Sequence, residues 1–235
     1  MKNLDNYNVE MKNILLRVDL NVPVIDEIVT EKSRIQTLRK TIKILQQQKN
    51  KIFLISHFGR PKGKKNKKYS LKFLCSILEL EFEVNKIEFI DTIDDFHIQR
   101  KINNMQYGDI CLFENIRFYQ EEENNDSNFI EGICKNFDVF VNDAFSASHR
   151  NHASIVGPCK FLPSLAGPNL LEEIKNINSF INNPKRPSLA IIGGSKISTK
   201  IKLLYNLIEL SDKIIIGGVM ANTFLFAQKI DIGKS

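Results

Sequence analysis

The sequence has 235 residues, 43% of them hydrophobic, and a formal net charge of +6 at pH 7. This composition excludes a disordered chain, and no apolar run reaches the roughly 18 residues that a membrane span needs. The four cysteines form no Cys-x-x-Cys pair, which argues against a zinc site, while the excess of positive charge favours anionic partners such as nucleic acid, phosphorylated metabolites or a membrane surface.

Short apolar runs alternate with amphipathic helical patterns along the chain. The predicted strands are residues 14–18, 52–56, 87–90, 110–113, 139–142, 189–192 and 213–216. Between them, Ser33 is expected to cap one helix and Ser70 to open another, because apolar residues then recur every three or four positions. This alternation predicts an α/β protein with a parallel, doubly wound (Rossmann-like) sheet that is covered on both faces.

Chain breakers bracket one helical stretch in the second half of the sequence. The breakers are Gly167, Pro168, Pro184 and Pro187, and the helical pattern between them covers about residues 170–181. One helix between breakers is typical of a connector between two lobes. We therefore predict a first lobe at 1–168, a hinge helix at 169–187 and the beginning of a second, incomplete α/β lobe at 188–235.

Polar and cationic residues follow the strands of the first lobe. They are Asp19, Asn21, His57, Arg60, Arg117 and Arg150, and Arg34 begins the first helix. Because the carboxyl ends of parallel strands meet at one edge of a sheet, these side chains are expected to converge there. Guanidinium groups match the oxygens of carboxylates and phosphates, so the pattern predicts a small ligand that carries both groups.

Each of these residues also has a structural interpretation. A single arginine after a strand can be a surface charge, and His57 can be a turn or packing residue. Asp19 and Asp143 can be turn or capping residues. The basic run Lys62–Lys68 is either a solvated loop or a nucleic-acid contact, and the second reading would require steeply salt-dependent binding to any duplex.

A second anion signal comes from the start of the second lobe. In "GGSKISTK", Gly193 and Gly194 are expected to lie where a strand meets a helix, with Lys196 and Lys200 on one helix face. Glycines at such a junction let backbone N–H groups approach a phosphate at the helix N-terminus. A packing turn is the alternative. The segment "KIIIGGVMANTF" repeats the strand, Gly-Gly and helix-start pattern.

The motifs RVDLNVP, SHFGRP, ENIRF, VNDAF with SHRNHAS, GGSK and IIGG resemble, in composition and order, those of the phosphoglycerate kinase family. The resemblance covers essentially the whole chain. It implies a two-lobed, typically monomeric, cytoplasmic enzyme of glycolysis. Such an enzyme transfers a phosphoryl group between 1,3-bisphosphoglycerate and ADP, giving 3-phosphoglycerate and ATP, with Mg²⁺ as the partner of the nucleotide. Nucleic acid and membranes are not among the implied partners.

The resemblance also implies roles for individual residues. The expected 3-phosphoglycerate ligands are Asp19, Asn21, Arg34, His57, Arg60, Arg117 and Arg150. The expected catalytic residues are Arg34, Lys196 and Lys200. The expected nucleotide-binding residues are Gly193, Gly194, Lys196, Lys200, Gly217 and Gly218. Such residue types suit phosphoryl transfer, which needs positioning and charge neutralisation more than covalent chemistry.

The sequence departs from the family pattern in a few places. Val219 stands where a third glycine is usual, and Glu172 where a lysine is common. Later strands of the second lobe and the Mg-ATP ligand have no counterpart, so we expect a truncated chain with impaired or absent activity and a protease-sensitive segment 188–235. The alternative is a non-catalytic fragment or degenerate copy that binds a phospho-carboxylate anion without turnover.

Overall fold

The computed structural model describes residues 1–26 and 28–235. The chain forms two compact units, Met1–Glu173 and Ile174–Ser235. Their division lies within helix α8 (Pro168–Asn182), which is the helix expected between the chain breakers. Each unit is described by itself below, and the division into two lobes and a hinge helix stays a prediction.

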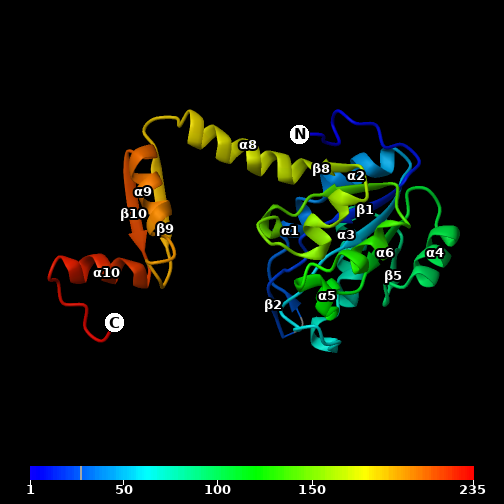
Figure 1. The fold of residues 1–235 in the computed structure, drawn as a ribbon, viewed down its shortest axis with the longest axis horizontal. Coiled ribbons are helices and arrows are strands. Elements are labelled where there is room, and N and C mark those ends of the chain that lie inside the picture. Colours follow the sequence, from blue (N-terminus) through cyan, green and yellow to red (C-terminus); the bar gives the residue numbers. More distant parts are fainter. Residues whose placement is uncertain (27) are drawn as a thin grey trace. The chain divides into compact units, whose positions relative to one another are not determined.

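In the part of the chain that the structure describes, unit Met1–Glu173 is built around a six-stranded sheet (Figure 1). In spatial order its strands are β5 (Ile87–Ile90), β6 (Ile110–Phe113), β4 (Lys51–Ile55), β1 (Asn13–Arg17), β7 (Val139–Asn142) and β8 (Ser164–Ala166). All five neighbouring pairs are parallel, which confirms the predicted sheet type.

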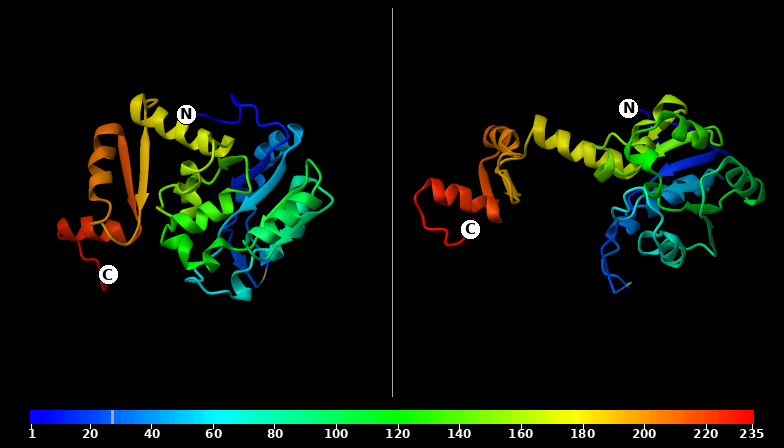
Figure 2. Two further views of the ribbon diagram at one scale, coloured as in Figure 1. Left: turned by 45° about the vertical axis from the view of Figure 1, so that its right-hand side comes forward. Right: turned by 60° about the horizontal axis from the view of Figure 1, so that its bottom comes forward.

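Helices follow most of these strands and lie on both faces of the sheet (Figure 2). They are α1 (Ser33–Gln36), α2 (Arg39–Gln47), α3 (Cys75–Phe82), α4 (Asp95–Asn104), α5 (Gln120–Glu123), α6 (Ser127–Cys134) and α7 (Ala153–Val156). A small antiparallel pair, β2 (Val24–Ile25) with β3 (Ile28–Val29), projects from the loop after β1.

Successive side chains of β1 enter two different cores. Ile14 and Leu16 pack into a cluster that contains Leu45 of α2, on one face of the sheet. Leu15 packs into a second cluster that contains Ile130 of α6, on the other face. All five side chains are completely buried. This alternation is what a parallel sheet covered on both faces requires, and it confirms the doubly wound architecture.

Two expected helix starts are wrong, and the three short strands β2, β3 and β8 were missed. Ser33 is the first residue of α1 rather than its cap, because Lys32 takes the N-cap position without a side-chain bond. Helix α3 begins only after a 3₁₀ turn at Lys72–Leu74, and the Ser70 hydroxyl donates instead to Glu114 Oε2 at 2.7 Å. Strand β8 has only three residues, too few for a periodic pattern to show.

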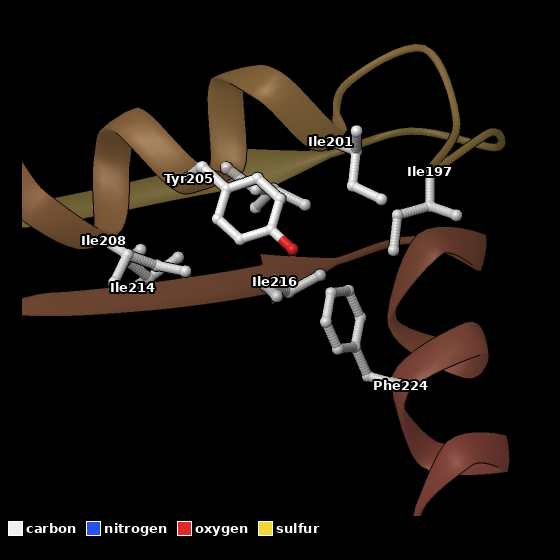
Figure 3. Close-up of a pocket in the computed structure, with 8 residues that line it drawn as sticks. Ile197, Ile201, Tyr205, Ile208, Ile214, Ile216 and Phe224 are labelled. Carbon is white, nitrogen blue, oxygen red and sulfur yellow. The ribbon is translucent and has the colours of Figure 1, made fainter.

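Unit Ile174–Ser235 holds a two-stranded parallel sheet of β9 (Leu189–Gly193) and β10 (Lys213–Gly217), with helices α9 (Ile201–Leu210) and α10 (Val219–Ala227). Both strands were predicted to within one residue. The buried core of this unit is small and consists of Ile192, Leu204 and Met220. An apolar cavity of about 340 Å³ remains between α9, β10 and α10 (Figure 3). It is lined by Ile197, Ile201, Leu204, Tyr205, Ile208, Ile214, Ile216 and Phe224.

We expect the amide hydrogens of β9 and β10 to exchange with solvent faster than those of β1 and β4. Within the described chain β9 and β10 pair only with each other, and Ile191 of β9 is 73% exposed, whereas Leu15 and Ile52 are 0% exposed. Local opening is easier where fewer apolar contacts are lost. Hydrogen-exchange mass spectrometry on the full chain measures this difference, and equal protection of the two sheets would contradict it.

Candidate anion-binding site

Four adjacent strands of unit Met1–Glu173 end at the same edge of the sheet. Strands β6, β4, β1 and β7 are neighbours in this order and run parallel. The segments that follow them carry Arg117 after β6, His57 and Arg60 after β4, Asp19 and Asn21 after β1, and Arg150 after β7. The topology therefore brings these residues, predicted from separate parts of the sequence, to one edge.

The turn after β4 is held from both sides through its backbone. Gly59 N donates to Asn21 Oδ1 at 2.9 Å, and Gly59 O accepts from Arg117 Nη1 at 3.0 Å. The φ of Gly59 is +60°, and a Cβ atom there would lie 2.6 Å from the Tyr69 ring. A glycine is therefore required where the loops after β1, β4 and β6 meet.

Asp19 and Arg34 lie together in a polar cavity. Arg34 Nη1 and Ser146 Oγ both donate to Asp19 Oδ2, and Asn21 N donates to Asp19 Oδ1 at 3.0 Å. The cavity has a volume of about 250 Å³, and Glu173 also lines it. Asp19 thus acts as a turn residue and as the ion-pair partner of Arg34. This ion pair holds the Arg34 side chain beside the cavity.

Asp143 has a capping role in the structure. Its Oδ1 atom accepts from the backbone N–H groups of Asn169 at 2.8 Å and Leu170 at 3.2 Å, at the start of α8. Its Oδ2 atom accepts from Asn169 Nδ2 at 2.7 Å and from the Thr41 hydroxyl. Burial raises the pKa of Asp143, and these hydrogen bonds oppose the rise. These contacts are those of the capping role that the sequence offered for Asp143, which also lines the cavity of Asp19 and Arg34.

The sequence analysis missed Arg17, which ends β1 and is only 1% exposed. Its Nε donates to Ser154 Oγ at 3.1 Å, its Nη1 donates to Val18 O, and its Nη2 lies 3.1 Å from His57 Nδ1. Burial lowers the pKa of Arg17. One signal was available: an arginine inside the apolar strand "ILLRVDL" is unusual, because charged residues are rarely buried without a partner.

The buried partner of this region is Glu122 of α5, which the sequence analysis also missed. Its two oxygens accept from the Ser154 hydroxyl and from Ser154 N, both at 2.7 Å, and Oε1 lies 3.6 Å from His152 Nδ1. Burial raises the pKa of Glu122, but His152, Arg17 and Ser154 together hold it below its ordinary value. Nothing local distinguishes Glu122 in the run "EEEN", which has the composition of a solvated surface.

Positive charge is concentrated around His57. Burial and then the charges of Arg17, Arg117 and Arg150 lower the pKa of His57 to about 2. Burial and then the charge of Arg150 lower the pKa of Arg117. Arg117 Nε is buried and has no hydrogen-bond partner among residues 1–26 and 28–235, although Glu123 Oε1 lies 3.6 Å away. Arg150 is partly exposed and Arg60 is exposed.

The predicted residues of unit Ile174–Ser235 are arranged differently from the expectation. Gly217 pairs with Gly193 across the sheet, and Met220 N donates to Gly194 O at 2.8 Å. Gly218 directly precedes α10, as expected for a strand-to-helix junction. The predicted helix face is wrong, because Lys196 and Lys200 precede α9 in a loop and turn. There the Lys200 ammonium group donates to Gly193 O.

The described side chains do not fit a metal ion. No group of three or more His, Cys, Asp or Glu residues that could hold one is found in the part of the chain that the structure describes. Two carboxylates beside the cationic residues, Asp19 and Glu122, already accept hydrogen bonds from neighbouring side chains, and Glu123 lies 3.6 Å from Arg117 Nε. None of the described helices is both long and apolar enough to cross a membrane.

The fold and this cluster together define a class: doubly wound α/β proteins with a cationic site at the carboxyl edge of the sheet. Within that class, the chain belongs to the phosphoglycerate kinase family, whose model, described as "Phosphoglycerate kinase", matches residues 4–235. The resemblance identified in the sequence motifs is thereby confirmed.

Individual relatives agree with the family match. The chain is 45% identical to the phosphoglycerate kinase of Rhizobium meliloti (strain 1021) over 235 residues, covering 100% of this chain and 59% of the relative. Among solved structures, phosphoglycerate kinase from Coxiella burnetii is 36% identical with a TM-score of 0.82, covering 99% of this chain and 58% of that one. The enzyme from Pyrococcus horikoshii OT3 is 28% identical with a TM-score of 0.89, covering 99% and 59%. The chain spans about 59% of the length of the curated relatives that it matches.

The low pKa of His57 predicts a specific dependence of stability on pH. The unfolded chain binds a proton at His57 below its ordinary pKa of 6.5, while the native state, with a pKa of about 2, does not. Stability is therefore present above pH 6.5 and is lost as pH falls, at about 1.4 kcal/mol per pH unit. Between pH 7 and pH 5 we expect the wild-type chain to lose about 2 kcal/mol more than His57→Gln.

Urea denaturation at both pH values measures this difference. His97→Gln is the matched control, because His97 is exposed and contacts Asp94 on α4, away from the cluster. The control should retain the full wild-type loss of stability. An identical pH dependence of His57→Gln and wild type would mean that His57 accepts a proton in the folded protein.

Proposed function

We propose that this chain is the 3-phosphoglycerate-binding lobe of a phosphoglycerate kinase together with the first part of its nucleotide-binding lobe. The complete reaction is the cytoplasmic, glycolytic transfer of a phosphoryl group between 1,3-bisphosphoglycerate and ADP. Family membership supports the reaction class. Because the chain spans about 59% of its relatives' length, the activity of those longer proteins reaches this chain only as part of the proposal.

The single observation that carries the proposal is the excess of buried positive charge at the strand ends. Arg17, Arg117 and Arg150 are close enough for Arg150 to lower the pKa of the other two, and Glu122 is the carboxylate buried among them. Like charges that are held together destabilise the fold unless an anion joins them. A ligand with a carboxylate and a phosphate supplies that charge, and arginine binds both groups bidentately.

The residues proposed to bind 3-phosphoglycerate are those predicted from the resemblance, and Arg17 is added as a residue that supports one of them. They are Asp19, Asn21, Arg34, His57, Arg60, Arg117 and Arg150, with Arg17 as the support of His57. Arg117 Nε is buried without a hydrogen-bond partner in the part of the chain that the structure describes, so it would gain most from a ligand oxygen. Arg34, beside its open cavity, would steady the phosphoryl group in transfer.

The nucleotide half of the proposal rests on the family more than on geometry. The proposed residues are Gly193, Gly194, Lys196, Lys200, Gly217 and Gly218, with Lys196 and Lys200 as further catalytic residues. The exposed Lys196 ammonium group is available to a phosphate, whereas the Lys200 ammonium group contacts Gly193 O and would have to exchange that contact. Mg²⁺ belongs to the proposal as the partner of ATP or ADP, and because the described donor set does not fit it, we assign it no ligand in this chain.

A second candidate function is binding without turnover. It is favoured by the open apolar cavity of unit Ile174–Ser235 (Figure 3). A coupled assay with ATP and 3-phosphoglycerate separates the two candidates. We expect the 235-residue chain to bind 3-phosphoglycerate with little or no turnover, and turnover at the rate of a full-length relative would reject the second candidate.

Arg150→Gln tests the anion site without disturbing the fold. The Arg150 charge repels Arg17 and Arg117, so its removal should leave the free energy of unfolding unchanged or slightly higher. The same change should raise the dissociation constant of 3-phosphoglycerate at least tenfold, because a charge-assisted hydrogen bond contributes about 1.5–3 kcal/mol. Isothermal titration calorimetry and urea denaturation measure the two effects.

Arg100→Gln is the matched control for this experiment. It removes the same charge from an exposed position in α4, so it accounts for any general loss of electrostatic attraction. Equal affinities of the two variants would exclude Arg150 as a ligand, and a failure of the wild-type chain to bind 3-phosphoglycerate at all would refute the proposed function.

A further inference from the structure

A chain of hydrogen bonds joins four buried side chains at the cationic cluster. Arg17 Nη2 lies 3.1 Å from His57 Nδ1. Arg17 Nε donates to Ser154 Oγ at 3.1 Å, and Ser154 Oγ donates to Glu122 Oε1 at 2.7 Å. Arg17, Ser154 and Glu122 are at most 1% exposed, and His57 is 5% exposed. Solvent therefore does not compete for these contacts.

The chemistry of the groups fixes the direction of every bond in this chain. A guanidinium group has donors and no acceptor, so His57 Nδ1 must accept from Arg17. The Ser154 hydroxyl accepts from Arg17, and its own hydrogen therefore points to the acceptor carboxylate of Glu122. Because Nδ1 carries no hydrogen, the neutral ring of His57 carries its hydrogen on Nε2, which is then a donor.

Glu122 accepts two hydrogen bonds from Ser154. These two bonds fix the end of the hydrogen-bond series that lies farthest from His57. The Ser154 backbone N–H and its hydroxyl donate to the two different oxygens of the carboxylate, each at 2.7 Å. The hydroxyl is thereby oriented toward Arg17 Nε, and the guanidinium plane is fixed by that bond and by the bond from Nη1 to Val18 O. An amide or a water could not reproduce this pattern, since the carboxylate must accept at both oxygens.

A neutral ring at His57 also agrees with the charges that face it. These are Arg17 from β1, Arg117 from the turn after β6, and Arg150 and His152 from the segment after β7. A protonated His57 would add a further positive charge to this group. A neutral ring that donates from Nε2 still binds an oxyanion and avoids that repulsion.

We propose that Ser154 and Glu122 are positioning residues that, through Arg17, hold His57 as the neutral tautomer protonated on Nε2 and so make it a hydrogen-bond donor to the bound anion. The assignment of the anion rests on the proposed function. The tautomer of His57 does not, because every bond in the series joins two groups of the protein itself. Ser154 contacts Arg17, and Glu122 contacts Ser154 and His152 rather than any residue proposed to bind the anion, so their effect on binding is indirect.

Nitrogen-15 NMR of the histidine rings in the 235-residue chain, without added ligand, tests the tautomer. The chain has four histidines, and His57→Gln identifies the signals of His57. At neutral pH we expect an unprotonated Nδ1 and a protonated Nε2 in the wild type. A ring protonated on Nδ1, or on both nitrogens, overturns the inference whether or not 3-phosphoglycerate binds. This measurement needs no variant that disturbs the chain of bonds.

Ser154→Ala tests the positioning role. Loss of the hydroxyl leaves Arg17 Nε without its acceptor, so His57 should show a mixture of both neutral tautomers and the affinity for 3-phosphoglycerate should fall about tenfold. Ser164→Ala is the matched control, because its hydroxyl donates to Leu162 O at 2.9 Å next to β8 and takes no part in the chain. The control should keep the single tautomer and the wild-type affinity.

The outcomes separate this inference from the proposed function. A single Nε2-protonated tautomer in Ser154→Ala would overturn the role of Ser154. A mixed tautomer with the affinity of the control would overturn the link between positioning and binding. The expected tautomers together with no 3-phosphoglycerate binding by any variant would refute the proposed function and leave the positioning of His57 standing. If Ser154→Ala does not fold, Glu122→Gln replaces it, with the same tautomer mixture expected.

Discussion

The guanidinium group of Arg17 lies at the end of the central strand β1 with almost no access to solvent. A buried cation needs hydrogen-bond acceptors for its N–H groups and an opposite charge nearby. Removal of one partner of a buried ion pair typically lowers the free energy of unfolding by about 3–5 kcal/mol. Arg17 meets this demand with groups from several parts of the chain: a backbone carbonyl next to β1, the ring of His57, the hydroxyl of Ser154 and the charge of Glu122. The loops at this edge of the sheet are therefore arranged around one charge.

The contacts around Arg17 also explain how several cationic side chains can be held together at one edge of the sheet. Glu122 compensates part of the positive charge from within, at a position where it cannot meet a ligand because all its visible contacts are internal. Glu123 lies 3.6 Å from Arg117 and compensates part of the charge of Arg117, while Arg150 still lowers the pKa of Arg117. The compensating carboxylate is thus buried, away from the surface at which the partly exposed Arg150 and the exposed Arg60 lie.

Sequence patterns predicted the sheet well, because strand positions depend on local apolar runs. The predicted strand 110–113 coincides with β6, and 52–56 differs from β4 by one residue at each end. The site was predicted less completely. Arg17 and Ser154 are 137 positions apart, and no local pattern reports a contact of that separation. The expected helix face for Lys196 and Lys200 is wrong because the loop before α9 is longer than a strand-to-helix junction. The roles carried over from the family motifs stay predictions.

The turn at Gly59 has a consequence for how this edge of the sheet can vary. Its contacts to Asn21 and Arg117 come from the N–H and the carbonyl of the backbone, so exchanging the amino acid cannot strengthen or redirect them. The positive φ belongs to the mirror-image half of conformational space, which an L-residue enters only with strain. Chirality and size therefore act together at this position, because the Cβ atom of any L-residue that accepted the positive φ would still lie 2.6 Å from the Tyr69 ring.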